Sequence, residues 1–391
     1  MKCLSLFSLV GMLLIASSLG VSQERPPRGN GGPPGGGFGG FGGAGKTLGQ
    51  TGKNIKVLTD APASQKNAIM DFFAASLGVK CSFCHVVDAE GLKPELDDNG
   101  KKKDAREMIQ MVMEINSKHF EGRPTVSCYT CHQGSTDPTV TASLPVVAAQ
   151  ERSEAEIEAR EKSMPKTDEI LAMYEKALGG ADAIGKIKSW NMKATFNRNG
   201  DEQHLELVMQ SPHKYAGTVS MGDRGNMTNV YDNGDGWSMS QMGARPMQDA
   251  EKTRIGREAA MVPVIRLKEL GKDLRFRGME KVDGKPAYLL VARMGDSIRE
   301  RYYVDSASNL LVRRNILNKS LVGWLPDQTD YSDYKAVEGV QMPWTVTYSY
   351  TDARNSTVRK FTEIKANAPV DDKLFQKPEM KPMQGKPGGG Q

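Results

Sequence analysis

The chain has 391 residues, of which 38% are hydrophobic and 25% are charged, and its formal net charge is +5. These values are ordinary for globular protein, and the length allows two or three domains. So small a net charge, without a clustered basic face, does not indicate nucleic-acid binding. The longest basic run, Lys101–Lys103, is flanked by acidic residues and is predicted to be a solvated loop.

Residues 1–22 have the features of a secretory signal peptide. Lys2 precedes an apolar stretch over 4–19, and small residues near Ser22 suit cleavage. The alternative is an uncleaved membrane anchor. We therefore expect a periplasmic or otherwise exported protein, with membrane association if this segment is retained.

Low-complexity segments separate the parts of the chain that are able to fold. Residues 23–50 are rich in Gly and Pro and are predicted to be a flexible linker. Residues 141–165 lose any apolar periodicity and are predicted to be a second linker. Residues 378–391 are predicted to be a disordered tail. The signal peptide, these three segments and the two regions between them make up the expected organisation.

Residues 51–140 are predicted to form a small all-α domain. Apolar residues recur at helical spacing over 65–77, and Gly78 is expected to end that helix. A second helix is predicted over 104–117.

Residues 166–377 are predicted to form a larger α+β domain with a curved, half-barrel-like antiparallel sheet. A helix over 167–178 opens the region, and a second one is expected over about 248–270. Elsewhere apolar and polar residues alternate between turn dipeptides such as Asn-Gly and Asp-Gly. The predicted strands cover 190–196, 204–209, 215–221, 227–231, 274–282, 287–294, 299–305, 310–317, 327–334, 345–351 and 357–366.

Two identical C-x-x-C-H units carry the clearest chemical signal in the chain. In this motif two thiols add to the vinyl groups of a porphyrin, and the following His binds the iron. A zinc or thiol-redox site is the alternative for a single unit, but two copies in an exported chain favour haem c. We predict two haems, attached through Cys81, Cys84, Cys128 and Cys131, with His85 and His132 as proximal iron ligands.

The opposite face of each iron needs a ligand, water or an open position. His119 is the only other His near the two units, because His204 and His213 belong to the strand-rich region. Met residues also precede each unit on the predicted helices. These are Met70 before the first unit, and Met108, Met111 and Met113 before the second. Each could equally fill the helical core.

Four stretches around these units resemble the cytochrome subunit of photosynthetic reaction centres. They are 54–58, 77–81, 105–116 and 126–134, within a region of about 85 residues. In that family a helix supplies an axial Met and is followed by a turn and the C-x-x-C-H unit. The resemblance therefore implies a helical electron-transfer domain with Met/His-ligated haems.

The same resemblance ranks the distal ligands. It implies Met108 for the second haem and Met70 for the first, with Met111 and His119 as alternatives. The family usually has four haems in two pairs, whereas this chain has one pair. His119 occupies the place of a His that ligates a haem of the other pair. Half of the family's module does not by itself indicate photosynthesis.

Residues 166–377 resemble, more weakly, the lipoprotein-sorting carriers of the bacterial envelope. The opening helix, Asp235–Trp237 and Val337–Pro343 carry this resemblance. Those carriers hold an acyl chain against an apolar concave face, so lipid binding is one expectation. A structural or docking domain with a filled interior is the other.

The predicted function is electron transfer with redox partner proteins, rather than enzyme catalysis. The strand-rich region has no Ser–His–Asp set or carboxylate pair at a specific spacing. A dihaem peroxidase with one open distal position is an alternative. Another is a carrier or sensor that couples haem redox state to a ligand in the β-rich domain.

Overall fold

The computed structural model describes residues 45–138, 163–198, 201–222, 225–241, 243–349 and 356–378. The predicted signal peptide, nearly all of both linkers and almost the whole tail lie outside these residues. The domain boundaries drawn from composition therefore stay predictions. Within the described ranges, no helix is both long enough and apolar enough to cross a membrane.

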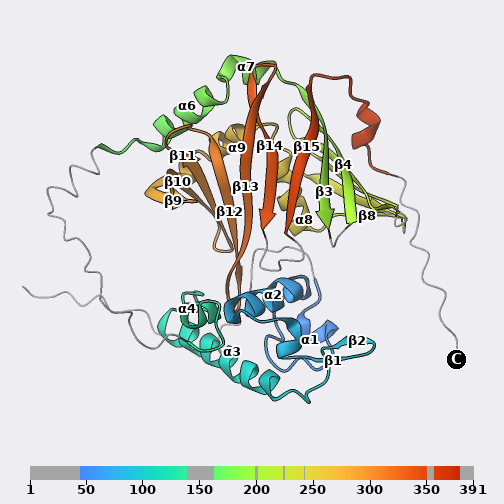
Figure 1. Cartoon of the computed structure of the whole chain (residues 1–391), viewed down its shortest axis with the longest axis vertical. Coiled ribbons are helices and arrows are strands. Elements are labelled where there is room, and N and C mark those ends of the chain that lie inside the picture. The colour runs from blue at the N-terminus through green and yellow to red at the C-terminus, as the bar shows by residue number, and fades with distance from the viewer. Residues whose placement is uncertain are drawn as a thin grey trace, which may run out of the picture. The chain divides into compact units, whose positions relative to one another are not determined.

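Residues 45–138 contain helices and one small hairpin (Figure 1). The hairpin follows the first C-x-x-C-H unit directly, because β-branched Val86 and Val87 extend the chain and Gly91, with φ of 114°, helps to reverse it. An all-α domain was expected here, so this part of the prediction is not confirmed. The elements are α1 (Leu48–Thr51), a 3₁₀ helix (Ala63–Gln65), α2 (Lys66–Leu77), a 3₁₀ helix (Cys81–Phe83), β1 (Val86–Asp88), β2 (Gly91–Lys93), α3 (Gly100–His119) and α4 (Cys128–His132).

The helix α2 ends where the sequence predicted, because Gly78 takes the left-handed conformation with φ of 67°. In contrast, α3 begins four residues before the predicted start. Asn99 caps it by accepting a hydrogen bond from the Lys101 amide at 3.0 Å. The predicted solvated loop at Lys101–Lys103 is therefore wrong, since these residues form the first turn of α3.

One apolar cluster holds this segment together. It contains Leu48, Ile69, Phe72 and Ile109, so α1, α2 and α3 share a core. Leu48 was assigned to the linker from composition, but its side chain is buried. Val322 and Leu325, which come from the β-rich region, belong to the same cluster.

The β-rich region forms one open antiparallel sheet of thirteen strands among the described residues (Figure 1). Two meanders, β3 to β8 and β9 to β15, join where β3 pairs with β15. The strands β8 and β9 are the free edges. The strands are β3 (Ser189–Arg198), β4 (Asp201–Gln210), β5 (Lys214–Ser220), β6 (Asn226–Asp232), β7 (Asp235–Ser240), β8 (Gly243–Pro246), β9 (Leu274–Val282), β10 (Lys285–Met294), β11 (Ile298–Asp305), β12 (Leu311–Ser320), β13 (Gly323–Val337), β14 (Val340–Ser349) and β15 (Thr357–Ala366).

The predicted large antiparallel sheet with a few helices is thus confirmed, with local differences. The strands β7 and β8 were not predicted, and Asp235–Trp237 opens β7 instead of forming only a turn. The single helix expected over 248–270 is two helices, α8 (Asp249–Glu258) and α9 (Pro263–Leu270). Pro263 stands at the start of α9, where its missing amide hydrogen is harmless, whereas inside one continuous helix it would remove a hydrogen bond.

Helices pack on one face of this sheet and complete the main core. They are α6 (Thr167–Ala177), α7 (Ala181–Lys186), α8 and α9. Trp190 of β3 is fully buried, and its indole nitrogen donates to the Met261 carbonyl at 3.1 Å, between α8 and α9. This bond ties the helices to the strand at which the two meanders join.

Candidate haem-attachment site

The first C-x-x-C-H unit lies between α2 and α3. Cys81 begins a 3₁₀ turn, and the His85 amide donates to the Cys81 carbonyl at 3.0 Å. The Asn99 side chain donates to the Phe83 carbonyl at 2.9 Å. The residue that caps α3 therefore also fixes the backbone of the first unit.

The second unit forms the whole of α4, and a buried Asn positions it. Asn116 of α3 accepts hydrogen bonds from the Thr125 and Val126 amides at 3.1 and 2.9 Å. Its amide nitrogen donates to the Val126 carbonyl at 2.7 Å. These three bonds hold the backbone just before Cys128, so α3 determines where the second unit begins.

A close backbone approach brings the two units together. The Gly134 amide donates to the Ser76 carbonyl at 2.9 Å. A Cβ atom at Gly78 would overlap the Gly134 carbonyl oxygen, so only glycine fits there. Gly78 precedes Cys81 by three residues, and Gly134 follows His132 by two. The two attachment units are therefore neighbours.

The two His rings differ in the surroundings of their Nδ1 atoms. His132 Nδ1 lies 3.0 Å from the Ser135 carbonyl, which can only accept, so Nδ1 carries the hydrogen and Nε2 keeps its lone pair. His85 Nδ1 is buried and has no hydrogen-bond partner among the described residues. Burial, with Lys102 and Arg106 nearby, lowers the pKa of His85, which favours the neutral form that binds metal.

All four Cys residues of the units are free thiols. Burial raises the pKa of Cys84, and it raises the pKa of Cys128 to about 11. Reactive redox cysteines have lowered pKa values, so the shifts at Cys84 and Cys128 do not favour a role in thiol–disulfide exchange for these two thiols. The described residues also contain no group of three or more His, Cys, Asp or Glu side chains placed to hold a metal ion.

Charged residues fix the loop that precedes α3. Asp97 accepts hydrogen bonds from Arg106 at 2.8 Å and from Lys56 at 2.6 Å, and Lys102 lies 3.0 Å away. These contacts hold the pKa of Asp97 well below its ordinary range, and the hydrogen bond from Arg106 has the largest effect. Lys102 is itself buried and donates to the Pro94 and Leu96 carbonyls, both at 2.7 Å.

The predicted distal ligands differ in their surroundings. Met108 and Met111 lie one turn apart on α3 and are 45% and 42% exposed. Met70 and Met113 instead pack against the apolar cluster of α1 to α3. His119 is exposed in the last turn of α3. Phe83 and Tyr129, each inside one of the two units, are exposed as well.

These residues fit haem c. Each unit provides two free thiols followed by a His, and each contains one exposed aromatic side chain, Phe83 or Tyr129. The structure places Cys81, Cys84, Cys128, Cys131, His85 and His132 in two adjacent units. Which of Met70, Met108, Met111 and His119 reaches an iron stays a prediction.

Comparison with known families supports a cytochrome-like role. Residues 43–168 match the model of the photosynthetic reaction centre cytochrome C subunit family, which confirms the resemblance of the helical segment. This match implies haem c binding, although it covers less than half of the chain. No curated protein matches the chain.

Solved structures resemble the β-rich region only distantly. They include a DUF1329 family protein from Desulfovibrio piger, with 11% identity, 55% of this chain and 98% of that chain covered, and a TM-score of 0.39. A LolA superfamily protein from Nitrosomonas europaea has 12% identity and also a TM-score of 0.39. The match covers 55% of this chain and 99% of that chain. A putative outer membrane lipoprotein-sorting protein domain from Vibrio parahaemolyticus has 12% identity and a TM-score of 0.38. The match covers 53% of this chain and 94% of that chain. The weaker resemblance recognised in the sequence recurs here, but such TM-scores carry no inference about function.

The C-x-x-C-H pattern predicted the attachment residues, but it did not indicate the residues that position the two units. Asn99, Asn116 and Gly134 fix the two units, yet none of them stands in the C-x-x-C-H motif. A signal existed for Asn99, since Asn is a preferred helix cap, but the lysines after it suggested a loop. The role of Asn116 depends on a loop ten residues away, which no local pattern reveals.

Proposed function

We propose that this protein is an exported c-type cytochrome that transfers electrons through two haems, one at each C-x-x-C-H unit. The observation that carries this proposal is the contact of Gly78 with Gly134, which makes the two units neighbours. Electron transfer between two centres requires that they lie close together, and a shared helical core provides this. The partners would be redox proteins outside the cytoplasm.

The residues of the chain would hold and tune the cofactor. Cys81, Cys84, Cys128 and Cys131 would anchor two haems c, and His85 and His132 would ligate the irons on the proximal side. Bound haem c would supply a one-electron Fe(III)/Fe(II) couple. The protein's part is to orient the groups, exclude water and set the potentials.

We further propose Met108 as the distal ligand of the second haem and Met70 as that of the first. The exposure of Met108, which Met111 shares, supports a role other than core filler, and the family resemblance favours Met108 of the two. Met70 has the weaker support, since it already contacts the cluster that contains Ile69 and Phe72. Met111 and His119 are the alternative distal ligands.

A haem count tests the proposal. The full chain would be matured with c-type haem machinery, and haem per chain would be measured as the pyridine complex. We expect two haems in the wild type and one in each of two variants, Cys81→Ser/Cys84→Ser and Cys128→Ser/Cys131→Ser. One haem in the wild type, or a pair of Cys substitutions that leaves the count unchanged, would contradict the proposal.

The spectrum distinguishes an electron carrier from a peroxidase. Two six-coordinate, low-spin haems that do not bind CO when reduced would support electron transfer. A high-spin ferric signal, or ready CO binding, would mean an open distal position and would favour a dihaem peroxidase. Fractionation of the host cell would test export, because a cytoplasmic location would contradict it.

A further inference from the structure

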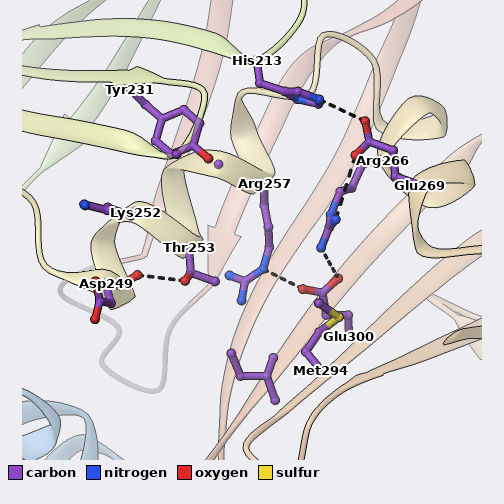
Figure 2. A pocket seen from close by; sticks show the side chains of 13 residues that line it. His213, Tyr231, Asp249, Lys252, Thr253, Arg257, Arg266, Glu269, Met294 and Glu300 are labelled. Atoms are coloured by element: carbon purple, nitrogen blue, oxygen red, sulfur yellow. Dashed lines mark hydrogen bonds and ion pairs between the residues drawn. The ribbon is translucent and has the colours of Figure 1, made fainter. Parts of the chain in front are cut away.

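A pocket with several charged residues in its lining lies within the β-rich region and takes no residue from either C-x-x-C-H unit (Figure 2). Its volume is about 450 Å³, within the range of small-molecule sites. It lies between α8, α9, β6 and the turn that joins β10 to β11.

A buried ion pair forms one wall of the pocket. Glu300 of β11 is 1% exposed, and it accepts hydrogen bonds from Arg257 Nε and the Tyr302 hydroxyl, both at 2.7 Å. Burying an ion pair removes both charges from water, and such a pair often stabilises a fold no better than apolar residues would. A buried ion pair is therefore weak evidence for a purely stabilising role.

The guanidinium of Arg257 has donors to spare. Its side chain is only 9% exposed, and Nε makes its single hydrogen bond to another described residue. Figure 2 shows the two terminal nitrogens turned away from Glu300. Two parallel N–H groups in one plane match the two oxygens of a carboxylate. The pocket thus offers a prepared site for an oxyanion.

The other charged side chains of the pocket limit how much negative charge a ligand can carry. A carboxylate oxygen of Glu300 lies 3.9 Å from one terminal nitrogen of Arg266. The other terminal nitrogen of Arg266 lies 4.0 Å from Glu269, and the second oxygen of Glu269 lies 3.1 Å from His213 Nε2. Arg257, Arg266 and Lys252 are balanced by Glu300, Glu269 and Asp249 among the lining residues. A ligand with several negative charges would meet repulsion here, whereas a single carboxylate would meet little.

Apolar side chains complete the lining and suggest the rest of the ligand. Met294, Ile298 and the ring of Tyr231 face the pocket beside the charged wall. A long acyl chain in this pocket would have to lie against the charged groups of Glu300, Arg266 and Glu269, which disfavours it.

We propose that this pocket binds a small monocarboxylate. The carboxylate is held by the terminal nitrogens of Arg257, and a short apolar part packs on Met294 and Ile298. The Glu300 carboxylate orients Arg257 through its Nε and so serves as a positioning residue.

Calorimetric titration of the full chain with hexanoate and hexanamide tests this site. The two probes share their apolar part, so a difference in affinity reports the carboxylate alone. We expect hexanoate to bind at least about tenfold more tightly than the amide, as one lost charge-assisted interaction implies. Equal affinities, no hexanoate binding at millimolar concentrations, or tighter binding of inorganic phosphate would overturn the proposal.

Variants identify the binding residue without depending on a damaged fold. Arg257→Gln alone would leave Glu300 buried without its partner, so the double variant Arg257→Gln/Glu300→Gln removes both charges. We expect it to keep its thermal unfolding transition and lose hexanoate binding. The matched control is Arg301→Gln, whose side chain pairs with Glu280 at 2.6 Å instead of facing the pocket, and it should bind as the wild type does. Unchanged hexanoate affinity in the double variant would also overturn the proposal.

Discussion

Neighbouring Met residues on α3 have different environments. The buried face of the helix carries Ile109, Val112 and Asn116, and Met113 packs against the same side. Met108 and Met111 project from the other side, where no described residue covers them fully. Residues three apart on a helix share one face, so either sulfur could reach a haem held beside that face.

Substituting these Met residues separately assigns the ligand. We expect Met108→Leu to abolish the weak far-red absorption of Met-ligated ferric iron for one haem and to lower its reduction potential. The thioether favours Fe(II), and Leu cannot replace it. Visible spectra and a redox titration would show this. Met111→Leu is the matched control and should leave both properties unchanged; the reverse pattern would assign Met111.

Asp97 makes stability depend on pH in the acid range. Arg106, Lys56 and Lys102 lower its pKa in the folded protein below the ordinary value of 3.8. The folded state therefore releases this proton more readily than the unfolded chain does. The resulting stabilisation is complete above the unfolded pKa and is lost as pH falls through the lower, folded value.

Asp97→Asn would reveal this contribution. The variant should have a lower free energy of unfolding than the wild type near neutral pH, and the difference should shrink as the pH falls below about 4. Denaturant titrations of the haem-loaded chain at several pH values would measure it. Asp98→Asn alters the adjacent, exposed acid and should show no such trend. A difference that is constant across pH would refute the assignment.

Single residues also show which features of the structure the sequence can predict and which it cannot. The C-x-x-C-H spacing predicted the attachment residues because haem chemistry requires it locally. Lys102 was misassigned because three lysines among acids usually lie in solvent. Its amino group instead satisfies two backbone carbonyls eight and six residues earlier in the chain. A contact made by folding back across a loop leaves no periodic trace in the sequence.

Among the secondary-structure elements, the junction of α2 with α4 should be sensitive to substitution. Gly78→Ala would force a left-handed conformation on alanine and overlap the Gly134 carbonyl oxygen. We expect a loss of about 1–3 kcal/mol from the backbone conformation alone, with a further loss from the overlap. Thermal unfolding would measure the total, and haem content would show whether the second unit still attaches its cofactor.

Gly100→Ala is the control for this substitution. Gly100 lies at the start of α3, and a Cβ atom there would meet nothing within 4 Å. Because alanine favours helix, this variant should be neutral or slightly stabilised. Equal destabilisation by both substitutions would mean that the close approach of Gly78 and Gly134 does not matter.

The strands were predicted well where alternation was long and poorly where it was short. The strands β3 and β4 alternate buried with more exposed residues along most of their length, as the period-2 pattern predicts. The strands β7 and β8 contain Gly, Ser and Pro and lie towards one edge of the sheet, so little apolar burial marks them. Pro263 is the sequence signal that divides α8 from α9. The apolar residues that continue on both sides of it favoured a single helix instead.

At the scale of the whole molecule, one strand pair connects distant parts of the chain. The strands β3 and β15 lie at opposite ends of the β-rich region, yet Trp190 is paired with Ala366. No local pattern predicts such a pairing, because strand propensity does not identify the neighbour. The prediction of a large antiparallel sheet was therefore correct, while its order of strands could come only from the structure.

Trp190 links this junction to the helices, and its substitution should destabilise the entire β-rich region. Trp190→Ala would leave a large cavity and should lower the free energy of unfolding by about 3–5 kcal/mol. Trp190→Phe would keep most of the ring but leave the Met261 carbonyl without its donor, at a cost of about 1–3 kcal/mol. Denaturant unfolding, followed by far-ultraviolet circular dichroism, would report both.

Trp344→Phe provides the comparison. The Trp344 indole nitrogen is buried but has no hydrogen-bond partner among the described residues. Replacing it with Phe removes a polar group that is not satisfied by the chain, so we expect little change or a slight gain in stability. If Trp344→Phe destabilised the protein as much as Trp190→Phe, lost ring packing would explain both effects. The bond from Trp190 to Met261 would then not be what joins the helices to the two meanders.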